Sequence, residues 1–367
     1  MHCYILGQTG TGKSTLLANI ARQDAAQGNG FCLIDPHGDL ASDLACELGD
    51  QAHYWDAANP SAPFGYNPLT RTAPNLRPLV ASGLIDTFKK QWSEAWGVRM
   101  EHLLRQALLV LLDQPKADLR DIMTLFLNRG FREDALSRVT DPQLLQFWHK
   151  EFPAMNYKTA ADGIAPIANK LGAFLSHPVV RKAICNPVEP LRFRRIMDQR
   201  EILLINLARG RLGPDIANVL GGLLVSNLIN AAFTRTDLPN ERRRLFSLII
   251  DEFHIFTTDA LADLLSETRK YGFGVILAQQ HTSQTAPTVL NSVFGNVGTM
   301  VVFRIGSTDT NRLAAQLGGV DRQDLLSQPN HRAFVRLMIN GAPHRAFSMT
   351  TMPPAVWEGN GRQGLRP

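Results

Sequence analysis

Short and almost continuous apolar runs recur along the chain, and most of them lead through a polar turn into a helical pattern. Such runs are typical of strands that are buried on both faces of a mainly parallel sheet. Their alternation with helices predicts an α/β fold. The strands are expected at residues 2–6, 30–34, 201–207, 245–250, 275–278 and 299–303.

Near the end of the chain, residues 332–339 and 342–349 flank Asn340-Gly341. Asn-Gly between two strand patterns is the strongest short signal for a β-hairpin, because both residues tolerate the positive φ angles of a tight turn. We therefore expect the sheet to close with an antiparallel pair. Residues 353–367, which contain Pro, Gly and Arg, are expected to form a flexible tail.

The middle of the chain has a helical pattern. Apolar residues recur at helical spacing over residues 100–112 and 159–175, and no strand run of comparable strength occurs there. We therefore expect an all-α domain at residues 86–190, inserted into or packed beside a sheet domain whose parts are residues 1–85 and 191–352. Its aromatic residues are expected in its core rather than as stacking platforms; they are Trp92, Trp96, Phe126, Trp148 and Phe152.

Residues 216–234 carry no charged side chain over a length that could cross a bilayer. Asn218, Gly222, Ser226 and Asn230 recur every fourth residue and so share one stripe of a helix. This polar stripe favours a buried helix of a globular domain over a membrane span. No signal-peptide pattern is visible, and because the chain opens directly on a strand we expect that a preceding segment is missing.

Composition and charge change this picture only slightly. The 367 residues are 44% hydrophobic and 19% charged, which is typical of a globular protein and argues against collagen-like or disordered chains. The net charge of +5 permits a polyanionic partner but cannot establish one. The four cysteines form no CxxC pair and have no histidine at metal-ligand spacing, which favours reduced thiols in a cytosolic protein.

The candidate chemistry begins directly after the first expected strand. Residues 7–14 read GQTGTGKS, which fits G-x-x-x-x-G-K-[ST] between a strand and a helix. A glycine-rich turn that serves packing alone is the alternative. In a P-loop, backbone N–H groups and the helix start face phosphate oxygens, Lys13 reaches the β- and γ-phosphates of ATP, and Ser14 ligates Mg²⁺. The expected nucleotide-binding residues are Gly7, Gln8, Thr9, Gly10, Thr11, Gly12, Lys13, Ser14 and Thr15.

A second acidic motif follows the apolar run 245–250, which ends in Asp251-Glu252. A buried strand delivers carboxylates to a site in this way, so these residues are the Walker B candidates. We expect Asp251 to hold magnesium, directly or through water, and Glu252 to act as general base on the attacking water. An acidic strand end that caps the next helix is the alternative.

Two further residues follow expected strands. Gln280 is a candidate sensor of the γ-phosphate, although glutamine at a strand end is often a turn residue. Arg304 is a candidate arginine finger that would act on a neighbouring subunit's nucleotide, with Arg269 as its rival and a surface salt bridge as the alternative. Asp35 and Asp39, around a Pro-His-Gly turn, are either turn residues or part of the site.

Two basic segments stand apart from these motifs. One contains Arg192, Arg194, Arg195 and Arg200, and the other is Arg242-Arg243-Arg244. Solvated faces are the usual meaning of such segments. If subunits formed a ring, arginines on its inner surface would bind a phosphate backbone regardless of base sequence.

Other classes of P-loop enzyme fit the sequence less well. The letters DEFH at residues 251–254 spell a DExH box, but too few residues follow for the second lobe of a superfamily 2 helicase. A GTPase would need N-K-x-D, whereas Asn169-Lys170 is not followed by the aspartate. The LSGGQ signature of ABC ATPases is absent from the sequence, and the two Walker motifs lie too far apart for a small-molecule kinase.

Several segments, in their order along the chain, resemble the HerA/FtsK superfamily of P-loop motors. Within it the sequence most resembles the coupling-protein ATPases of conjugative type IV secretion systems, the TraD/TraG-like proteins. The resemblance spans nearly the whole chain. Its segments read GQTGTGKSTLL, LIDPHGDL, FGYNPL, PIANKLGAFLSHP, ILLINLARGRLG, LFSLIIDEFHIF, RKYGFGVILAQQ and VVFRIG.

This resemblance implies a RecA-like domain, an all-α domain, a hexameric ring, ATP-driven DNA translocation, and contact with a relaxase and the secretion channel. It also places Lys13 and Ser14 on phosphate and magnesium, Asp251 and Glu252 in Walker B, Gln280 at the sensor position and Arg304 as the finger. Such proteins usually begin with membrane helices, so attachment at the cytoplasmic face of the inner membrane would need a segment absent from this chain.

Two other functions stay open on the sequence alone. One is a secretion ATPase that moves protein and binds no DNA. The other is a HerA-like motor of DNA repair or defence. Both share the P-loop chemistry, so the motifs alone do not separate them from a conjugative DNA motor.

Overall fold

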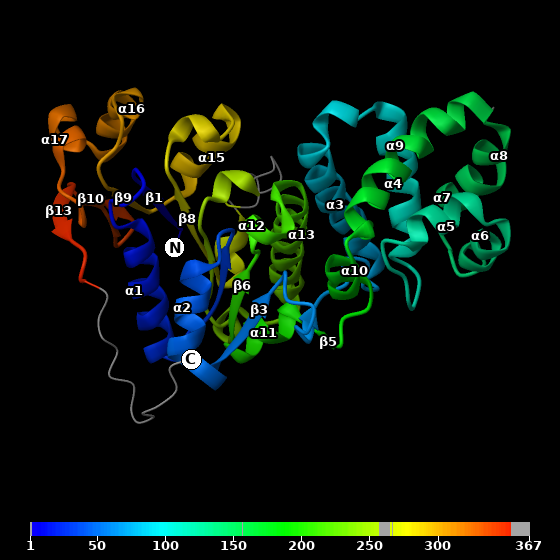
Figure 1. The fold of residues 1–367 in the computed structure, drawn as a ribbon, viewed down its shortest axis with the longest axis horizontal. Coiled ribbons are helices and arrows are strands. Elements are labelled where there is room, and N and C mark those ends of the chain that lie inside the picture. Colours follow the sequence, from blue (N-terminus) through cyan, green and yellow to red (C-terminus); the bar gives the residue numbers. More distant parts are fainter. Residues whose placement is uncertain (1, 156, 257–264, 266, 354–367) are drawn as a thin grey trace. The chain divides into compact units, whose positions relative to one another are not determined.

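The computed structural model describes residues 2–155, 157–256, 265 and 267–353, without the side chains of residues 157–161 and 269. The chain divides into two compact units (Figure 1). The sheet unit comprises Met1–Tyr54, Arg194–Leu207 and Ala232–Pro367, and the helical unit comprises Trp55–Phe193 and Ala208–Ala231. These divisions differ from the expected boundaries after residues 85 and 190, because residues 55–85 and 208–231 pack with the helical unit.

A nine-stranded sheet forms the centre of the sheet unit, as the apolar runs predict. Strands β6, β2, β7, β8, β1 and β9 pair in parallel, and β10 and β13 add an antiparallel edge. The order across the sheet is β13-β10-β9-β1-β8-β7-β2-β6-β3. The bounds are β1 (Cys3–Leu6), β2 (Gly30–Asp35), β3 (Ala52–Asp56), β6 (Ile202–Asn206), β7 (Phe246–Ile250), β8 (Phe273–Gln279), β9 (Thr299–Val302), β10 (Arg332–Arg336) and β13 (Phe347–Thr350).

The predicted hairpin is confirmed. Asn340 and Gly341 have φ angles of 51° and 81°, and they join β11 (Met338–Ile339) to β12 (Ala342–Pro343). Beyond the hairpin tip, β10 pairs with β13. Val335 pairs with Phe347, so the returning strand has one more residue than its partner between the two ladders. Such an extra residue is a bulge, which bends the end of the sheet.

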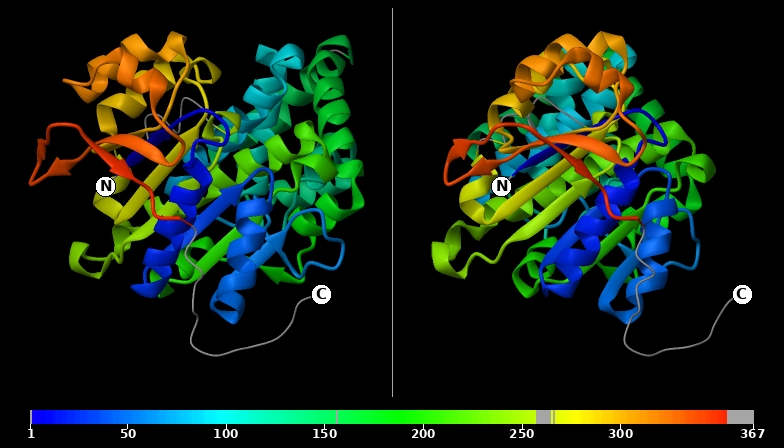
Figure 2. Two further views of the ribbon diagram at one scale, coloured as in Figure 1. Left: turned by 60° about the vertical axis from the view of Figure 1, so that its left-hand side comes forward. Right: turned by 90° about the vertical axis from the view of Figure 1, so that its left-hand side faces the viewer.

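Helices of the sheet unit pack on the sheet through apolar side chains. Helices α1 (Lys13–Ala26) and α2 (Asp39–Leu48) lie on one face, where Leu17 and Leu44 join a buried cluster with Ile5, Phe31 and Leu33 (Figure 2). Alternate residues of each strand face this cluster, as the period of a strand requires. The other helices of this unit are α11 (Phe193–Gln199), α15 (Pro287–Asn296), α16 (Ser307–Leu317) and α17 (Arg322–Ser327).

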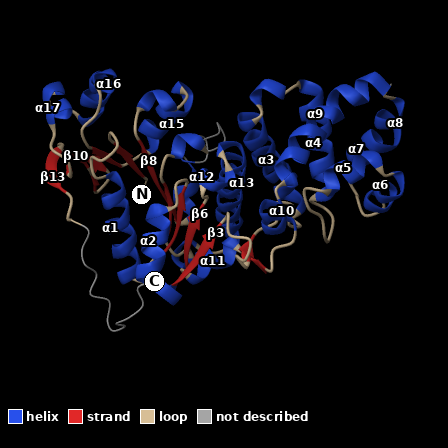
Figure 3. Cartoon of the chain, viewed as in Figure 1, coloured by secondary structure: helices blue, strands red, loops and turns tan. Residues whose placement is uncertain are grey.

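The helical unit contains almost no strand (Figure 3). Of the five aromatic residues expected in its core, Trp92, Phe126 and Trp148 are buried, whereas Trp96 and Phe152 are half-buried. The ring of Trp148 lies 4.9 Å from that of Phe152 and 5.7 Å from that of Phe126. A short parallel pair joins β4 (Phe64–Gly65) to β5 (Glu189–Pro190). The helices are α3 (Arg77–Gln91), α4 (Val98–Leu111), α5 (Asp121–Leu127), α6 (Arg129–Leu136), α7 (Pro142–Gln146), α8 (Phe152–Ala154), α9 (Tyr157–Ser176), α10 (Pro178–Cys185), α12 (Arg209–Leu212) and α13 (Pro214–Phe233).

Helix α13 contains the uncharged stretch of the sequence. By length and composition it is the one helix of the described chain that could cross a membrane, with a mean hydropathy of 1.6, but 61% of that window is buried. Its small residues pack closely against α3: a Cβ atom on Gly222 would lie 2.7 Å from Cγ2 of Thr87. The stripe predicted from the sequence is therefore a helix-packing surface, which is what a buried globular helix requires.

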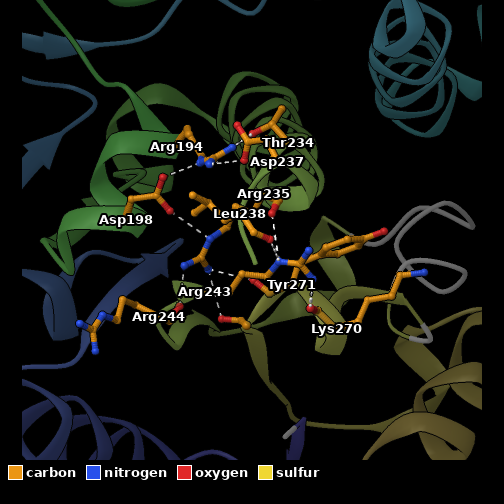
Figure 4. A network of polar contacts seen from close by, with 11 residues as sticks. Arg194, Asp198, Thr234, Arg235, Asp237, Leu238, Arg243, Arg244, Lys270 and Tyr271 are labelled. Carbon is orange, nitrogen blue, oxygen red and sulfur yellow. Dashed lines mark hydrogen bonds and ion pairs between the residues drawn. The ribbon is translucent and has the colours of Figure 1, made fainter. Parts of the chain in front are cut away.

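A buried polar network holds the edge at which β7 and β8 begin (Figure 4). Its centre is Arg235, in the turn η5 (Thr234–Asp237), whose side chain is completely buried. The guanidinium donates to the carbonyl oxygen of Arg244 at 2.7 Å and to that of Tyr271 at 3.0 Å. Its Nε lies 3.1 Å from Asp198 Oδ1. Arg235 therefore ties the backbone before β7 to the backbone before β8 and to α11.

Two arginines of the basic segments belong to the same network. Arg194 donates to Asp237 at 2.7 Å, and Arg243 donates to the carbonyl oxygen of Lys270 at 2.7 Å. Both therefore hold the sheet edge together. By contrast Arg242 and Arg244 have exposed side chains, and that of Arg244 points away from the network (Figure 4). The predicted contact of these segments with DNA remains a prediction for the exposed arginines.

We expect Arg235→Met to destabilise the sheet unit by about 3 kcal/mol, because buried carbonyl oxygens lose their donors and Asp198 loses its buried partner. Urea unfolding followed by circular dichroism measures the change. Arg195→Met is the matched control, since the Arg195 side chain is 64% exposed and such surface pairs contribute little. Equal unfolding midpoints for the two variants would contradict the role assigned to Arg235.

Candidate active site

The P-loop connects β1 to α1 in a shape that only glycine adopts easily. Helix α1 begins at Lys13, and its N-cap residue, Gly12, has a φ angle of 112°. At this angle a side chain would be strained, so the turn depends on glycine. The backbone N–H groups at the start of the helix have no partner within the helix, and the helix dipole adds positive potential there. The turn therefore presents a site suited to an anion.

Neighbouring strands hold the loop in place. The Gln8 N–H donates to the carbonyl oxygen of Arg304 at 3.0 Å, just beyond the end of β9. The Gly7 N–H donates to the carbonyl oxygen of Gln279, at the end of β8, at 3.3 Å. Within the loop, the Thr11 hydroxyl donates to the Gln8 carbonyl oxygen at 2.6 Å. The loop therefore moves only if the ends of these strands move with it.

Lys13 lies folded back on the loop. Its Nζ donates to the carbonyl oxygen of Gly7 at 2.7 Å and to that of Gln8 at 3.3 Å, and the residue is 7% exposed. Burial lowers the pKa of Lys13, and the nearby carboxylates of Glu252 and Asp251 oppose this shift. The ammonium group is thus a buried cation with both acids near it, as a phosphate-binding lysine requires.

The two acids follow β7 as the sequence predicts. Asp251 is 8% exposed and its N–H donates to the carbonyl oxygen of Ile34, in the neighbouring β2. Glu252 is 5% exposed and has a φ angle of 47°, in the left-handed region that a glutamate rarely adopts. Its N–H donates to Asp251 Oδ1 at 3.0 Å. Strained backbone of this kind persists only where the surroundings hold it, commonly at functional sites.

The environment of the two acids favours a bound cation. Burial raises the pKa of Asp251 to about 6, and the charges of Glu252 and Asp35 add to this while Lys13 opposes it. Buried Oε2 of Glu252 has no hydrogen-bond partner in the described chain, and it lies 3.4 Å from His254 Nδ1. An excess of buried negative charge around one orphaned oxygen is what a bound metal with its water would relieve.

A hydrogen-bonded chain joins the P-loop to the second acid. The Thr9 hydroxyl donates to Gln280 Oε1 at 3.0 Å, and Gln280 Nε2 donates to Glu252 Oε1 at 2.7 Å. Gln280 comes directly after β8, so its amide lies between the loop after β1 and the loop after β7. The structure thus brings three of the sequence-predicted residues into one contact chain.

The residues of the site surround a cavity of about 300 Å³, which a second cavity of about 310 Å³ adjoins beside α2. Ser14, Thr15 and Asp251 line both. A serine hydroxyl and a carboxylate are the hard oxygen ligands that Mg²⁺ prefers, with phosphate oxygens and water as its other ligands. The orphaned oxygen, the buried lysine and this donor set therefore fit ATP with Mg²⁺.

Asp35 has features of both predicted roles, that of a turn residue and that of a part of the site. The carboxylate of Asp35 accepts the N–H of His37 at 2.9 Å and that of Ala41 at 3.1 Å, so both oxygens serve the turn and the start of α2. Asp35, His37 and Asp39 also line the second cavity. These residues shape the wall of the site, while the described contacts of Asp35 are those of a turn residue.

The structure describes the side chain of one of the two arginine-finger candidates. Arg304 is half-buried, and its Nη1 donates to the carbonyl oxygen of Gln328 in the same chain at 3.1 Å. The side chain of Arg269 lies outside the described residues. The choice between them remains a prediction.

Sequence reasoning missed His331. This residue comes directly before β10, and its N–H donates to the carbonyl oxygen of Thr11 in the P-loop at 2.7 Å. It lines the same cavity as Lys13 and Glu252. The residue belongs to no motif, and its place depends on the long-range pairing of β10 with β9. No local pattern indicates it.

Two family models match the chain. That of the central domain of the helicase HerA matches residues 1–177, and that of the DNA-binding domain of type IV secretion-system coupling proteins matches residues 217–330. The chain is therefore similar to HerA in its first part and to the coupling proteins in its second, and both matches support its assignment as a P-loop ATPase. The two matches divide the candidate site: the P-loop lies in the first, and Asp251, Glu252, Gln280 and Arg304 lie in the second.

Several solved structures have a similar fold. The bacterial conjugative coupling protein TrwBΔN70 is 19% identical, with a TM-score of 0.69 over 96% of this chain and 85% of that one. TrwB in complex with ADP and Mg²⁺ is 19% identical, with a TM-score of 0.65 over 96% and 84%. VirB4 of Thermoanaerobacter pseudethanolicus is 15% identical, with a TM-score of 0.64 over 96% and 89%. No curated protein sequence matches the chain.

We expect Asp251→Asn to stabilise the nucleotide-free protein at pH 8 when Mg²⁺ is chelated with EDTA. Folding raises the pKa of Asp251 to about 6, so the native fold favours the protonated acid and loses stability as the pH rises through that value. The gain is on the order of 1–3 kcal/mol at pH 8 and disappears below about pH 4, where the acid is protonated in both states. Thermal unfolding of both proteins at several pH values measures it. A difference that stays constant across this range would show that titration of Asp251 is not its cause.

Proposed function

We propose that this chain is the ATPase region of a type IV secretion coupling protein, a motor that hydrolyses ATP and moves DNA toward a secretion channel. One observation carries the proposal: the segment that matches the coupling-protein DNA-binding domain, residues 217–330, also contains both acids of the site. The same three strands, β7, β8 and β9, would therefore position residues for DNA contact and residues for ATP hydrolysis. The likeness of the fold to TrwB supports the same assignment.

Each polar group of the site has a role in this proposal. ATP with Mg²⁺ supplies the phosphoanhydride bond whose hydrolysis drives movement. Lys13 leaves the loop carbonyl oxygens to hold the β- and γ-phosphates, while Ser14 and Asp251 hold the metal. Gln280 occupies Glu252 Oε1, which leaves the unpartnered Oε2 to accept a proton from the attacking water. Loss of the γ-phosphate would be sensed through Gln280, because its amide also contacts Thr9 in the P-loop.

Arg304 is proposed to act on the nucleotide of the neighbouring subunit in a homo-oligomeric ring of six. It would have to exchange the Gln328 carbonyl oxygen for a phosphate oxygen, which carries more charge and is the stronger acceptor for a guanidinium. Its backbone already contacts Gln8 of its own P-loop. An arginine finger at this position would couple nucleotide binding in one subunit to nucleotide binding in the adjacent subunit.

We expect Glu252→Gln to retain ATP binding and to lose hydrolysis by a factor of about 10²–10⁴, because an amide cannot accept the proton. Arg304→Ala should also bind ATP and hydrolyse it slowly. Mixing the two inactive proteins should restore part of the turnover, since some interfaces pair an intact Glu252 with an intact Arg304. Steady-state phosphate release measures this, with Lys13→Ala, which should fail to bind, as the control. A mixture as inactive as its components would argue against a finger in trans.

The partners follow from the same assignment. We propose contact with a relaxase, which would deliver the DNA, and with proteins of the secretion channel. The ATPase would work in the cytoplasm, at the cytoplasmic face of the inner membrane. Contact with DNA would involve exposed arginines such as Arg242 and Arg244, which precede β7.

A second candidate function follows from the fold likeness to VirB4. The chain would then energise secretion of protein without binding DNA. The match to the HerA central domain keeps a third possibility, a motor of DNA repair or defence, which would share the DNA dependence but need no secretion partner. DNA dependence separates the second function from the other two.

We expect long DNA at low salt to bind the protein and to accelerate its ATP hydrolysis. Binding should weaken steeply as salt rises, because each phosphate contact releases counterions. The double variant Arg242→Gln/Arg244→Gln should bind less tightly with a shallower salt dependence, whereas Arg195→Gln, another exposed arginine, serves as the control. Hydrolysis and affinity measured over a salt series test this. ATP hydrolysis that is indifferent to DNA but responds to a secreted protein would favour the VirB4-like function.

A further inference from the structure

His331 lies directly against the bend of the P-loop. A Cβ atom placed on Gly12 would be 2.9 Å from Nδ1 of His331 and 3.2 Å from its Cα, so the ring fills the space that a side chain at Gly12 would need. His331 also lines the cavity of about 300 Å³ that Lys13, Ser14 and Glu252 line. Its imidazole is thus a wall of the nucleotide cavity, contributed from the far end of the chain.

The backbone of His331 is held at both of its polar groups. Its N–H donates to the Thr11 carbonyl oxygen at 2.7 Å, and its own carbonyl oxygen accepts the N–H of Thr351 at 2.8 Å and the hydroxyl of the same residue at 3.1 Å. Its φ angle is 66°, in the left-handed region that a residue with a Cβ adopts only at a cost in free energy. The surroundings therefore hold an unfavourable backbone conformation that keeps the ring beside the P-loop.

The ring itself is available to a ligand. Its nitrogens make no hydrogen bond within the described part of the chain, although the backbone around them is fully engaged. An imidazole carries at least one N–H donor whether neutral or protonated. His331 is exposed, its backbone is held in place, and its ring nitrogens have no partner in the described protein. An imidazole donor placed in this way beside an anion site is suited to contact an oxygen of the bound nucleotide.

We propose that His331 binds the nucleotide, contacting the α- and β-phosphates or the sugar that follows them. This inference rests on the ATPase function proposed above and adds a binding residue to the same cavity. The P-loop backbone around Gly12 cradles the α- and β-phosphates, whereas Lys13 reaches the γ-phosphate. Glu252 and Gln280 serve that γ end as well. His331 therefore contacts a part of the ligand that ATP and ADP share, and it takes no part in the hydrolytic step.

Two substitutions separate the ring from the backbone. Glycine adopts positive φ without strain, and asparagine does so more readily than most residues, so His331→Gly and His331→Asn keep the contact with Thr11. We expect both to weaken ADP and ATP binding about tenfold and to a similar extent, as the loss of one hydrogen bond to a charged group implies. The kcat of saturated enzyme should stay within about twofold, because the hydrolytic groups are intact.

The experiment uses the whole chain and a fluorescent ADP analogue, with a non-hydrolysable ATP analogue as competitor. Adding free imidazole should restore part of the affinity of His331→Gly and should leave that of His331→Asn unchanged, since only the glycine variant leaves room for it. His344→Asn is the matched control, because His344 is exposed and does not line the cavity. Its affinity and kcat should equal those of the unaltered protein.

Three results would overturn the proposal. Unchanged affinity in both His331 variants would show that the ring does not contact nucleotide. Weaker binding accompanied by a lower unfolding temperature, and not restored by imidazole, would assign His331 to support of the loop alone. If the unaltered protein bound no nucleotide, the ATPase function itself would fail and this inference with it, whereas the first two results leave that function standing.

Discussion

Strand β1 pairs in parallel with β8 on one side and with β9 on the other, and this pairing decides where the chemical groups of the site lie. Leu6 is in register with Gln279 and with Val302. The carboxyl ends of these strands therefore meet at one edge, where ligands bind in open α/β sheets. The P-loop, the amide after β8 and the arginine after β9 come together because hydrogen bonds of buried strands leave no other alignment. A shift of one residue in β1 would turn its side chains to the opposite face.

Burial places two like charges close together in the site, at a cost in free energy. Asp251 and Glu252 are almost completely buried, and the charge of Lys13 interacts with both. Like charges at this depth are costly unless a cation joins them. Gln280 donates a hydrogen bond to Oε1 of Glu252, whereas Oε2 has no hydrogen-bond partner in the described chain. A site built in this way favours its ligand because the empty state leaves polar groups unsatisfied.

Most of the sheet could be predicted because fully buried parallel strands read as continuous apolar runs, and the P-loop because its spacing is almost invariant. The Asn340-Gly341 turn was equally clear from local chemistry. Strand β3, with the sequence AHYWD, escaped because its polar residues give no such run. The assignment of α3 and α13 to one unit depends on Thr87 packing on Gly222, and the place of His331 depends on β10. Contacts between distant segments leave no periodic trace in the sequence, so these features required the structure.

The place of β1 in the sheet has a consequence for biosynthesis. Its two neighbours, β8 and β9, lie in the last third of the chain, so the strand of this sheet that is synthesised before the others is among the last to find its partners. At roughly 5–20 residues per second, this wait is on the order of 15 to 60 s. Throughout that time the apolar strand β1 and the P-loop after it lack the two neighbouring strands that hold them. The strand pairing that forms the nucleotide site thus leaves the nascent chain open to aggregation until β8 and β9 have been synthesised.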